Sequence, residues 1–200
     1  MDSFGTIIWA LQGGDASVGR CDDRALGMHV TPDGYSYITG TNWSGFDLGT
    51  CSLSGAAPNS ADGSILGKVD PNGNCVWLKT FGANEGAGSG PDCPWPIYDG
   101  DDHSYDVKVD EDGFIYVAGF YSGLSADFDA FSITNPDWGV DCQPNGYVGK
   151  LDNNGNWLLN QGEIIELKGL PSGEHVIEVQ IKSRQGEWRG LYPVTFYVEK

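Results

Sequence analysis

The stretch TPDGYSYITG at residues 31–40 recurs as DEDGFIYVAG at residues 110–119, 79 positions further along the chain. In both copies an Asp-Gly pair separates two short runs in which apolar and polar residues alternate. Alternation with a period of two is typical of β-strands, and Asp-Gly supplies a tight turn with its glycine at positive φ. Each copy therefore predicts a β-hairpin, and their recurrence predicts a modular all-β protein.

A second hairpin follows in each copy. SILGKVDPNGN at 64–74 aligns with GYVGKLDNNGN at 146–156, and GTIIWALQGG at 5–14 aligns with GNCVWLKTFG at 73–82. Two hairpins per copy give four strands per repeat. In the first copy we expect these strands at about 25–31, 35–41, 64–70 and 75–81.

Four short antiparallel strands per repeat are typical of propeller blades. The combination of a Trp-bearing strand, an Asp-Gly hairpin ending in Tyr-x-x-Gly and a Gly-Lys-x-Asp-x-x-Gly-Asn hairpin resembles the bacterial β-propeller (SBBP) repeat over residues 5–156. The resemblance implies extracellular, mostly non-enzymatic propellers in large surface proteins, without a known ligand.

The last forty residues differ from the repeats. Residues 1–160 hold 6 basic and 22 acidic side chains, whereas residues 161–200 hold 5 and 6. The turn GLPSGEH and the GEW before the final strand resemble the end of an immunoglobulin-like or fibronectin type III-like module. The predicted fold is therefore all-β, with four-stranded propeller-like blades at about 15–82 and 83–160 and a three-stranded Ig-like antiparallel segment at 161–200.

The strand expected at 5–14 precedes the first blade and has no blade of its own. Two blades cannot close a ring, because the faces of each blade need neighbours. We therefore expect this strand to act as a latch that pairs with another chain, through Thr6, Ile7, Ile8, Trp9 and Leu11. The alternative is that the sequence is a segment of a longer protein and that its ends are arbitrary.

Four of the five cysteines occupy equivalent loops of the two repeats. Cys21 and Cys51 precede the first strand and lie between the second and third strands of the first repeat, and Cys93 and Cys142 do the same in the second. This pattern predicts the disulfides Cys21–Cys51 and Cys93–Cys142 and an oxidising, extracellular or cell-surface location. Cys75 is expected to be a buried apolar residue.

The net charge of −17 makes nucleic acid and anionic membranes unfavourable partners. No run approaches the ~18 apolar residues of a membrane span. The first residues lack the basic region of a signal peptide, so a secreted protein would have this sequence as a processed form or a fragment.

No nucleophile elbow, phosphate loop or zinc signature is present, and the protein is therefore predicted not to be an enzyme. A hydrolase using Asp101 or Asp102 is the remaining catalytic alternative. Calcium is the one cofactor considered, at the densest carboxylate cluster, which comprises Asp99, Asp101, Asp102 and Asp106. Alternatively, the repeated pairs Asp22/Asp23 and Asp101/Asp102 cap strands and turns.

Aromatic residues gather in the long loops, where a ligand would bind. Beside carboxylates they suit sugar rings, and the candidate ligand-binding set is Trp43, Trp95, Tyr98, Tyr121 and Trp138. The alternative is that these side chains cover loop cores between blades.

The predicted function is a secreted, non-enzymatic structural or adhesive protein that assembles by β-strand complementation as a surface scaffold or filament subunit. Its expected partners are copies of itself or other domains of a larger surface protein. The alternative is a carbohydrate-binding lectin in which two blades per protomer close a ring by oligomerisation.

Overall fold

The computed structural model contains strands and no helix in the residues it describes. The predicted all-β class is therefore correct. No helix long and apolar enough to cross a membrane occurs in this part of the chain. The described residues are 6–14, 23–42, 45–53, 63–83, 102–129, 131–134, 144–158, 165–167, 173–182 and 188–198.

The first repeat forms an antiparallel meander in chain order, which we call the first sheet. Its strands are β2 (Arg24–Val30), β3 (Ser36–Asn42), β6 (Gly63–Val69) and β7 (Cys75–Ala83). Each begins within about one or two residues of the position expected from the alternating pattern. Local sequence and turn chemistry suffice to place these strands.

The second repeat forms an equivalent second sheet. Its strands are β8 (His103–Val109), β9 (Ile115–Tyr121), β12 (Asn145–Leu151) and the short β13 (Ile165–Leu167). β13 pairs with Gly146, Tyr147 and Val148 only. The first strand of the expected C-terminal segment thus belongs to the second sheet.

The rest of the C-terminal segment is one long hairpin rather than three strands. It comprises β14 (Gly173–Lys182) and β15 (Trp188–Val198), and β15 lies against β8 and β9 of the second sheet. A two-stranded hairpin is marginal by itself, and packing against the second sheet supplies the support it needs.

Each repeat inserts a small hairpin between its second and third strands. In the first repeat this hairpin is β4 (Phe46–Leu48) and β5 (Cys51–Leu53), and β4 pairs with β1 (Gly13–Gly14). In the second it is β10 (Ser125–Phe128) and β11 (Phe131–Thr134), and β10 pairs with β7.

The four predicted turns share one geometry. In the turn after β6, the N–H of Asp70 donates to the carbonyl of Asn74 and the N–H of Gly73 donates to the carbonyl of Asp70, and the other three turns repeat this pattern. Gly73 has φ 86°, a conformation in which glycine avoids the Cβ clash. Hydrogen bonds from the side chain and backbone of Asn74 lower the pKa of Asp70.

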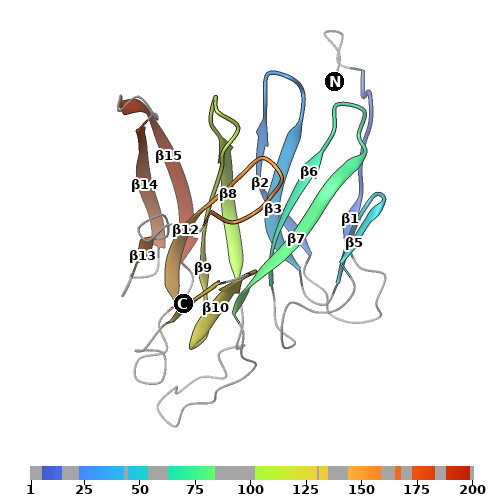
Figure 1. The fold of residues 1–200 in the computed structure, drawn as a ribbon. Coiled ribbons are helices and arrows are strands. Elements are labelled where there is room, and N and C mark those ends of the chain that lie inside the picture. Colours follow the sequence, from blue (N-terminus) through green and yellow to red (C-terminus); the bar gives the residue numbers. More distant parts are fainter. Residues whose placement is uncertain are drawn as a thin grey trace.

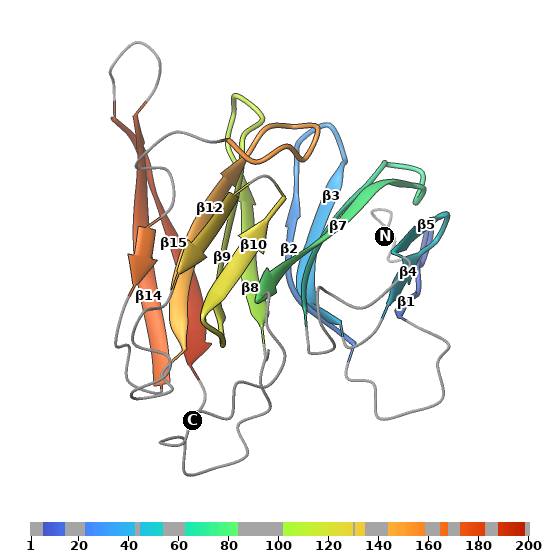
Figure 2. The ribbon, with the colours of Figure 1, turned by 60° about the horizontal axis from the view of Figure 1, so that its bottom comes forward.

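The sheets stack side by side, in the order β14–β15, second sheet, first sheet and the small sheet β1–β4–β5 (Figures 1 and 2). Two hydrophobic clusters fill the spaces on either side of the first sheet. The larger joins the first and second sheets around Phe81, Val107 and Tyr147. The smaller lies between the first sheet and the small sheet, around Phe46, Ile65 and Val69.

The disulfide in the structure joins Cys51 and Cys75, with their Cα atoms 5.8 Å apart. The expected pair Cys21–Cys51 is therefore wrong, and so is the assignment of Cys75 as an unpaired apolar residue. The cause is the inserted hairpin, which folds back over the first sheet and places β5 beside β7. Cys21, Cys93 and Cys142 lie outside the described residues.

Replacing both Cys51 and Cys75 with serine should lower the free energy of unfolding by about 3 kcal/mol, because the crosslink restrains the unfolded chain. Urea unfolding of the variant and the parent measures this difference. Peptide mapping without reductant should recover Cys51 linked to Cys75. A peptide linking Cys21 to Cys51 would contradict the structure.

Candidate assembly interface

The contact between the first and second sheets contains the larger of the two hydrophobic clusters. β8 lies against β2 and β3, so the second sheet faces the first. Val107, Ile115 and Val117 of the second sheet pack with Tyr37 and Leu66 of the first, and all five are buried. Close packing of two apolar faces excludes water and stabilises both sheets.

A polar contact fixes the register of this interface. The hydroxyl of Tyr37 donates to Oδ1 of Asn153 at 2.7 Å, and Nζ of Lys68 donates to the same oxygen at 2.6 Å. Asn153 lies in the turn after β12, whereas Tyr37 and Lys68 belong to the first sheet. Because one acceptor serves two donors, sliding one sheet past the other would leave both donors without it.

The same two donors are held by their own sheet. The ammonium of Lys68 lies 4.6 Å from the centre of the Tyr35 ring and 5.3 Å from that of Tyr37. Burial lowers the pKa of Lys68, while the carboxylate of Asp33 opposes this shift. Burial, and then the nearby Asp33, raises the pKa of Tyr37 to about 12.

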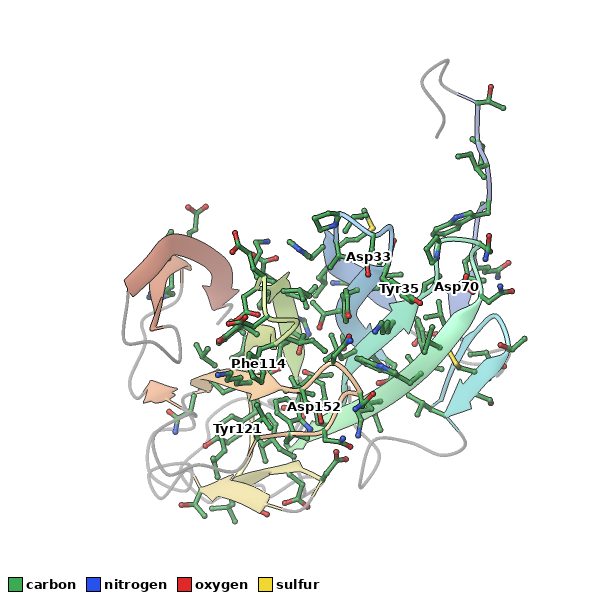
Figure 3. All side chains as sticks on the ribbon, turned by 45° about the horizontal axis from the view of Figure 1, so that its top comes forward. Asp33, Tyr35, Asp70, Phe114, Tyr121 and Asp152 are labelled. Atoms are coloured by element: carbon green, nitrogen blue, oxygen red, sulfur yellow. A yellow bond between two sulfur atoms is a disulfide. The ribbon has the colours of Figure 1, made fainter. Side chains whose placement is uncertain are left out.

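The second repeat builds the same arrangement on its other face. Lys150, Phe114 and Tyr116 align with Lys68, Tyr35 and Tyr37, and the Lys150 ammonium lies 4.2 Å from the centre of the Phe114 ring. Figure 3 labels Tyr35 and Phe114, each after the glycine of its own hairpin turn. This lysine-over-aromatic platform is therefore a property of the repeat.

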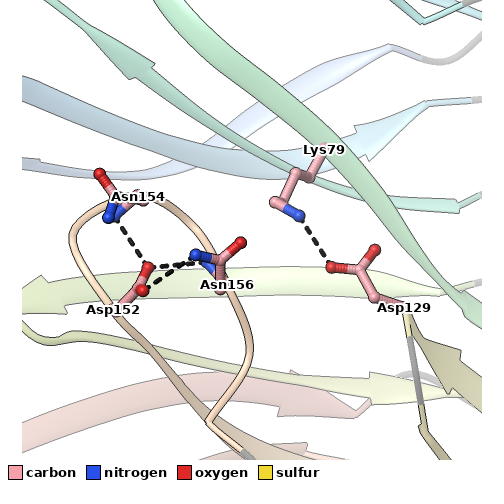
Figure 4. Close-up of polar contacts among 5 residues, drawn as sticks. All are labelled: Lys79, Asp129, Asp152, Asn154 and Asn156. Atoms are coloured by element: carbon pink, nitrogen blue, oxygen red, sulfur yellow. Dashed lines mark hydrogen bonds and ion pairs between the residues drawn. The ribbon is translucent and has the colours of Figure 1, made fainter.

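Strand addition joins the repeats a second time. β10 of the second repeat pairs with the end of β7, through Ala126 opposite Ala83 and Asp127 opposite Gly82. Nζ of Lys79 on β7 lies 2.7 Å from Oδ2 of Asp129 at the tip of this hairpin (Figure 4). The outer edge of the first sheet is thus extended by a strand from the second repeat.

The inserted hairpin of the first repeat pairs with a preceding strand in the same way. Asp47 of β4 pairs with Gly14, as Asp127 pairs with Gly82. Ser52 and Ser132 each donate a hydrogen bond to the aspartate opposite them, Asp47 and Asp127 respectively. The residues 46–53 and 126–133 are therefore a third aligned pair of segments.

Sequence reasoning missed this pair. FDLGTCSL and ADFDAFSI share only the Asp and the Ser, 80 positions apart, and no Asp-Gly turn marks the hairpin. The signal that could have found it is this spacing, which lies between the offsets of 79 and 82 already seen on either side. Asp129 adopts φ 56° where the first repeat has Gly49 at φ 60°.

The predicted assembly strand does not form a strand in the structure. Residues 6–12 have no assigned secondary structure, and chain pairing begins only at Gly13. Thr6, Ile7 and Ile8 are exposed, whereas Trp9 and Leu11 pack on the smaller hydrophobic cluster. The Nε1 of Trp9 donates to the carbonyl of Pro71 at 3.0 Å.

The candidate calcium ligands are not gathered in the described residues. Asp102 is buried, and its carboxylate accepts hydrogen bonds from the backbone N–H groups of Ala83 and Ser122. Asp106 forms an ion pair with Lys108 at 2.7 Å. No group of three or more potential metal ligands occurs among the described residues, and Asp99 and Asp101 lie outside them.

Asp102 therefore has a structural role that fits the alternative interpretation of the repeated aspartates. Its carboxylate connects the start of β8 to the ends of β7 and β9, across the interface between the sheets. This residue acts as a clamp between backbone segments.

Of the candidate ligand-binding aromatics, too, only some lie in the described residues. Tyr121 is fully buried in the larger cluster, so it cannot offer a ring to a sugar in this structure (Figure 3). Trp43, Trp95, Tyr98 and Trp138 lie outside the described residues. For Tyr121, the alternative of an aromatic that covers the core is the correct one.

No family model matches the chain, and no curated protein matches it with significant sequence similarity.

Replacing Asp102 with asparagine should lower the free energy of unfolding by about 2 kcal/mol, because the amide cannot accept from both backbone donors through two oxygens. The matched control is Asp23→Asn at the aligned, half-buried position of the first repeat, which should cost less. Thermal unfolding of both variants measures the difference. A loss of less than about 0.5 kcal/mol for Asp102→Asn would contradict the clamp.

Alkaline pH should weaken the interface through Tyr37. Its pKa in the folded protein is about 12 against 10.0 for the free group, so the stability that it contributes is complete below pH 10.0 and is lost as the pH rises through about 12. The lowered pKa of Lys68 acts in the opposite direction but is common to the parent and a Tyr37→Phe variant.

Urea unfolding of the parent and of Tyr37→Phe across this pH range isolates the contribution of the phenol. The parent should lose stability more steeply than the variant above pH 10.0. Parallel curves would show that the pKa of Tyr37 is not raised on folding.

Proposed function

We propose that the protein is a non-enzymatic structural or adhesive module of a surface scaffold, built from propeller-like blades that join by β-strand addition. The observation that carries this proposal is the pairing of β10 from the second repeat with β7 of the first. A repeat that completes the sheet of its neighbour is suited to building longer arrays.

Three further features support the proposal. The sequence resembles the bacterial β-propeller repeat, whose members are extracellular and mostly non-enzymatic. The Cys51–Cys75 disulfide is consistent with an oxidising compartment outside the cytoplasm. The buried aspartate and the fully buried tyrosine among the candidate site residues have structural partners, which leaves little for catalysis in the described residues.

The partners in this proposal are copies of the chain or other domains of a larger surface protein. Such a scaffold needs exposed surfaces to which further modules can add, and the chain offers the exposed apolar side chains of Ile7, Ile8, Met28 and Val30. The net charge of −17 keeps the unassembled form soluble and disfavours nucleic acid.

Cell fractionation tests the proposal. In the cells that produce it, the protein should be recovered from the surface fraction in assemblies larger than one chain. Deleting residues 1–11 should release it as single chains, whereas the aligned-site variant Asp23→Asn should leave the assemblies intact. Recovery of single chains from the cytosol would contradict the proposal.

A lectin remains the second candidate, because aromatics and carboxylates cluster in the sequence of the long loops. A glycan array probed with the full chain separates the two functions: reproducible binding to a defined sugar favours the lectin, and no binding favours the scaffold.

A further inference from the structure

Aligned apolar residues on β2 and β8, the first strands of the two repeat sheets, differ sharply in exposure. Met28 and Val107 hold the same place in their sheets, since Met28 is opposite Ile38 and Val107 is opposite Val117. Met28 is 62% exposed, whereas Val107 is 0% exposed. Likewise Val30 is 53% exposed and its equivalent Val109 is 8% exposed.

The cause of this difference is a neighbouring sheet. Val107 and Val109 are covered by the first sheet, with Tyr37, Leu66 and Phe81 in the same cluster. The equivalent face of the first sheet is covered on its outer half, where Trp9, Leu11 and the β4–β5 hairpin pack. Along β2 that face stays exposed in the described structure.

The segment 6–14 already holds the place of an outer strand from a preceding sheet. The Trp9 ring lies 2.9 Å from where a Cβ on Gly73 would be, and the aligned Trp77 ring lies 3.2 Å from the same point on Gly155. Leu11 approaches Gly49 as Lys79 approaches the aligned Asp129. Each repeat thus meets the Trp-bearing segment that precedes it in the chain, segment 6–14 for the first repeat and β7 for the second.

What the segment lacks is the pairing that its equivalent has. β7 pairs with β6 from Cys75 to Phe81, whereas residues 7–12 are assigned to no strand in the described structure. Ile7 and Ile8 in this segment are each 67% exposed, and exposed apolar residues beside a segment outside the sheets mark a docking surface for a sheet.

We propose that the exposed face of β2 and residues 7–12 together dock the first three strands of a further sheet of this same repeat, supplied from outside these 200 residues. Its third strand pairs with residues 7–12, as β6 pairs with β7, and its aromatic face covers Met28 and Val30, as the first sheet covers Val107 and Val109. This inference rests on the proposed scaffold function and specifies its partner.

The occupant is not a second copy of the chain. A copy would have to offer the face that carries the lysine-over-aromatic platform. In the first sheet that face is covered by the second sheet, and in the second sheet β15 lies against β8 and β9. Neither matching face is open among the described residues.

The new contact is more apolar than the one inside the chain. The position of Asn153, whose side chain accepts from Tyr37 and Lys68, is taken by Pro71 in the first repeat. Proline offers no side-chain acceptor, and its carbonyl already accepts from Trp9. The partner sheet therefore does not need a lysine at the position of Lys68.

A lengthened chain tests this surface directly. Residues 1–14 are replaced with a second copy of residues 15–82, because residue 82 aligns with residue 14. The lengthened chain contains Met28 twice, once at the new end and once inside, under the added sheet. Met28→Asp is introduced at each position separately, and also in the parent chain.

The internal Met28→Asp should lower the melting temperature by about 10 °C, because it buries a charge. The same change at the end of the lengthened chain, or in the parent, should shift it by less than about 2 °C, as expected of an exposed site. These measurements use purified protein, so their result is independent of where the protein resides in the cell.

Equal effects at the two positions of the lengthened chain would overturn the proposal, and so would a lengthened chain that does not fold while the parent does. Light scattering of the parent tests the other possible occupant, a second copy of the chain. A dimer that Met28→Asp dissociates would assign the surface to a second copy and would also overturn the proposal.

Discussion

The packing of the second sheet on the first is the contact on which the rest of the structure depends. A four-stranded sheet with apolar side chains on both faces cannot keep them from water by itself. Val107, Ile115 and Val117 are removed from water only because the first sheet covers them. Part of the stability of each repeat consequently comes from its contact with the neighbouring repeat.

Two kinds of interaction make this contact specific. Apolar burial would permit the sheets to slide, but Asn153 accepts from Tyr37 and Lys68 at one position only. An aromatic cluster closes the outer end, where Phe81 meets Phe128 and Trp157 with ring centres 5.6 Å and 5.0 Å apart. Hydrophobic area supplies the energy, and the hydrogen bonds and ring contacts select one arrangement.

The parts of this fold that could be predicted from the sequence are local. Each Asp-Gly or Asn-Gly turn and the alternation beside it fix a hairpin without reference to the rest of the chain, and seven of the eight repeat strands follow from them. The eighth, β13, does not adjoin a turn of this kind. The disulfide was mispredicted because Cys51 reaches Cys75 only when β5 folds back beside β7. This contact belongs to the tertiary structure and has no local signal in the sequence. Tyr121 was mispredicted because nothing in the sequence distinguishes an exposed tyrosine from a buried one.

The same distinction explains why the interface could not be read from the sequence. Tyr37 and Asn153 are 116 residues apart and meet only because the second sheet stacks on the first. The repeat nevertheless allows an argument that a single copy would not, since each position has an internal reference in a different environment. Identical strand registers with opposite exposures show that the environment, and not the residue type, decides which face is buried. A protein built in this way has unequal ends: β14–β15 lies against one face of the stack, while the small sheet covers only the outer half of the other.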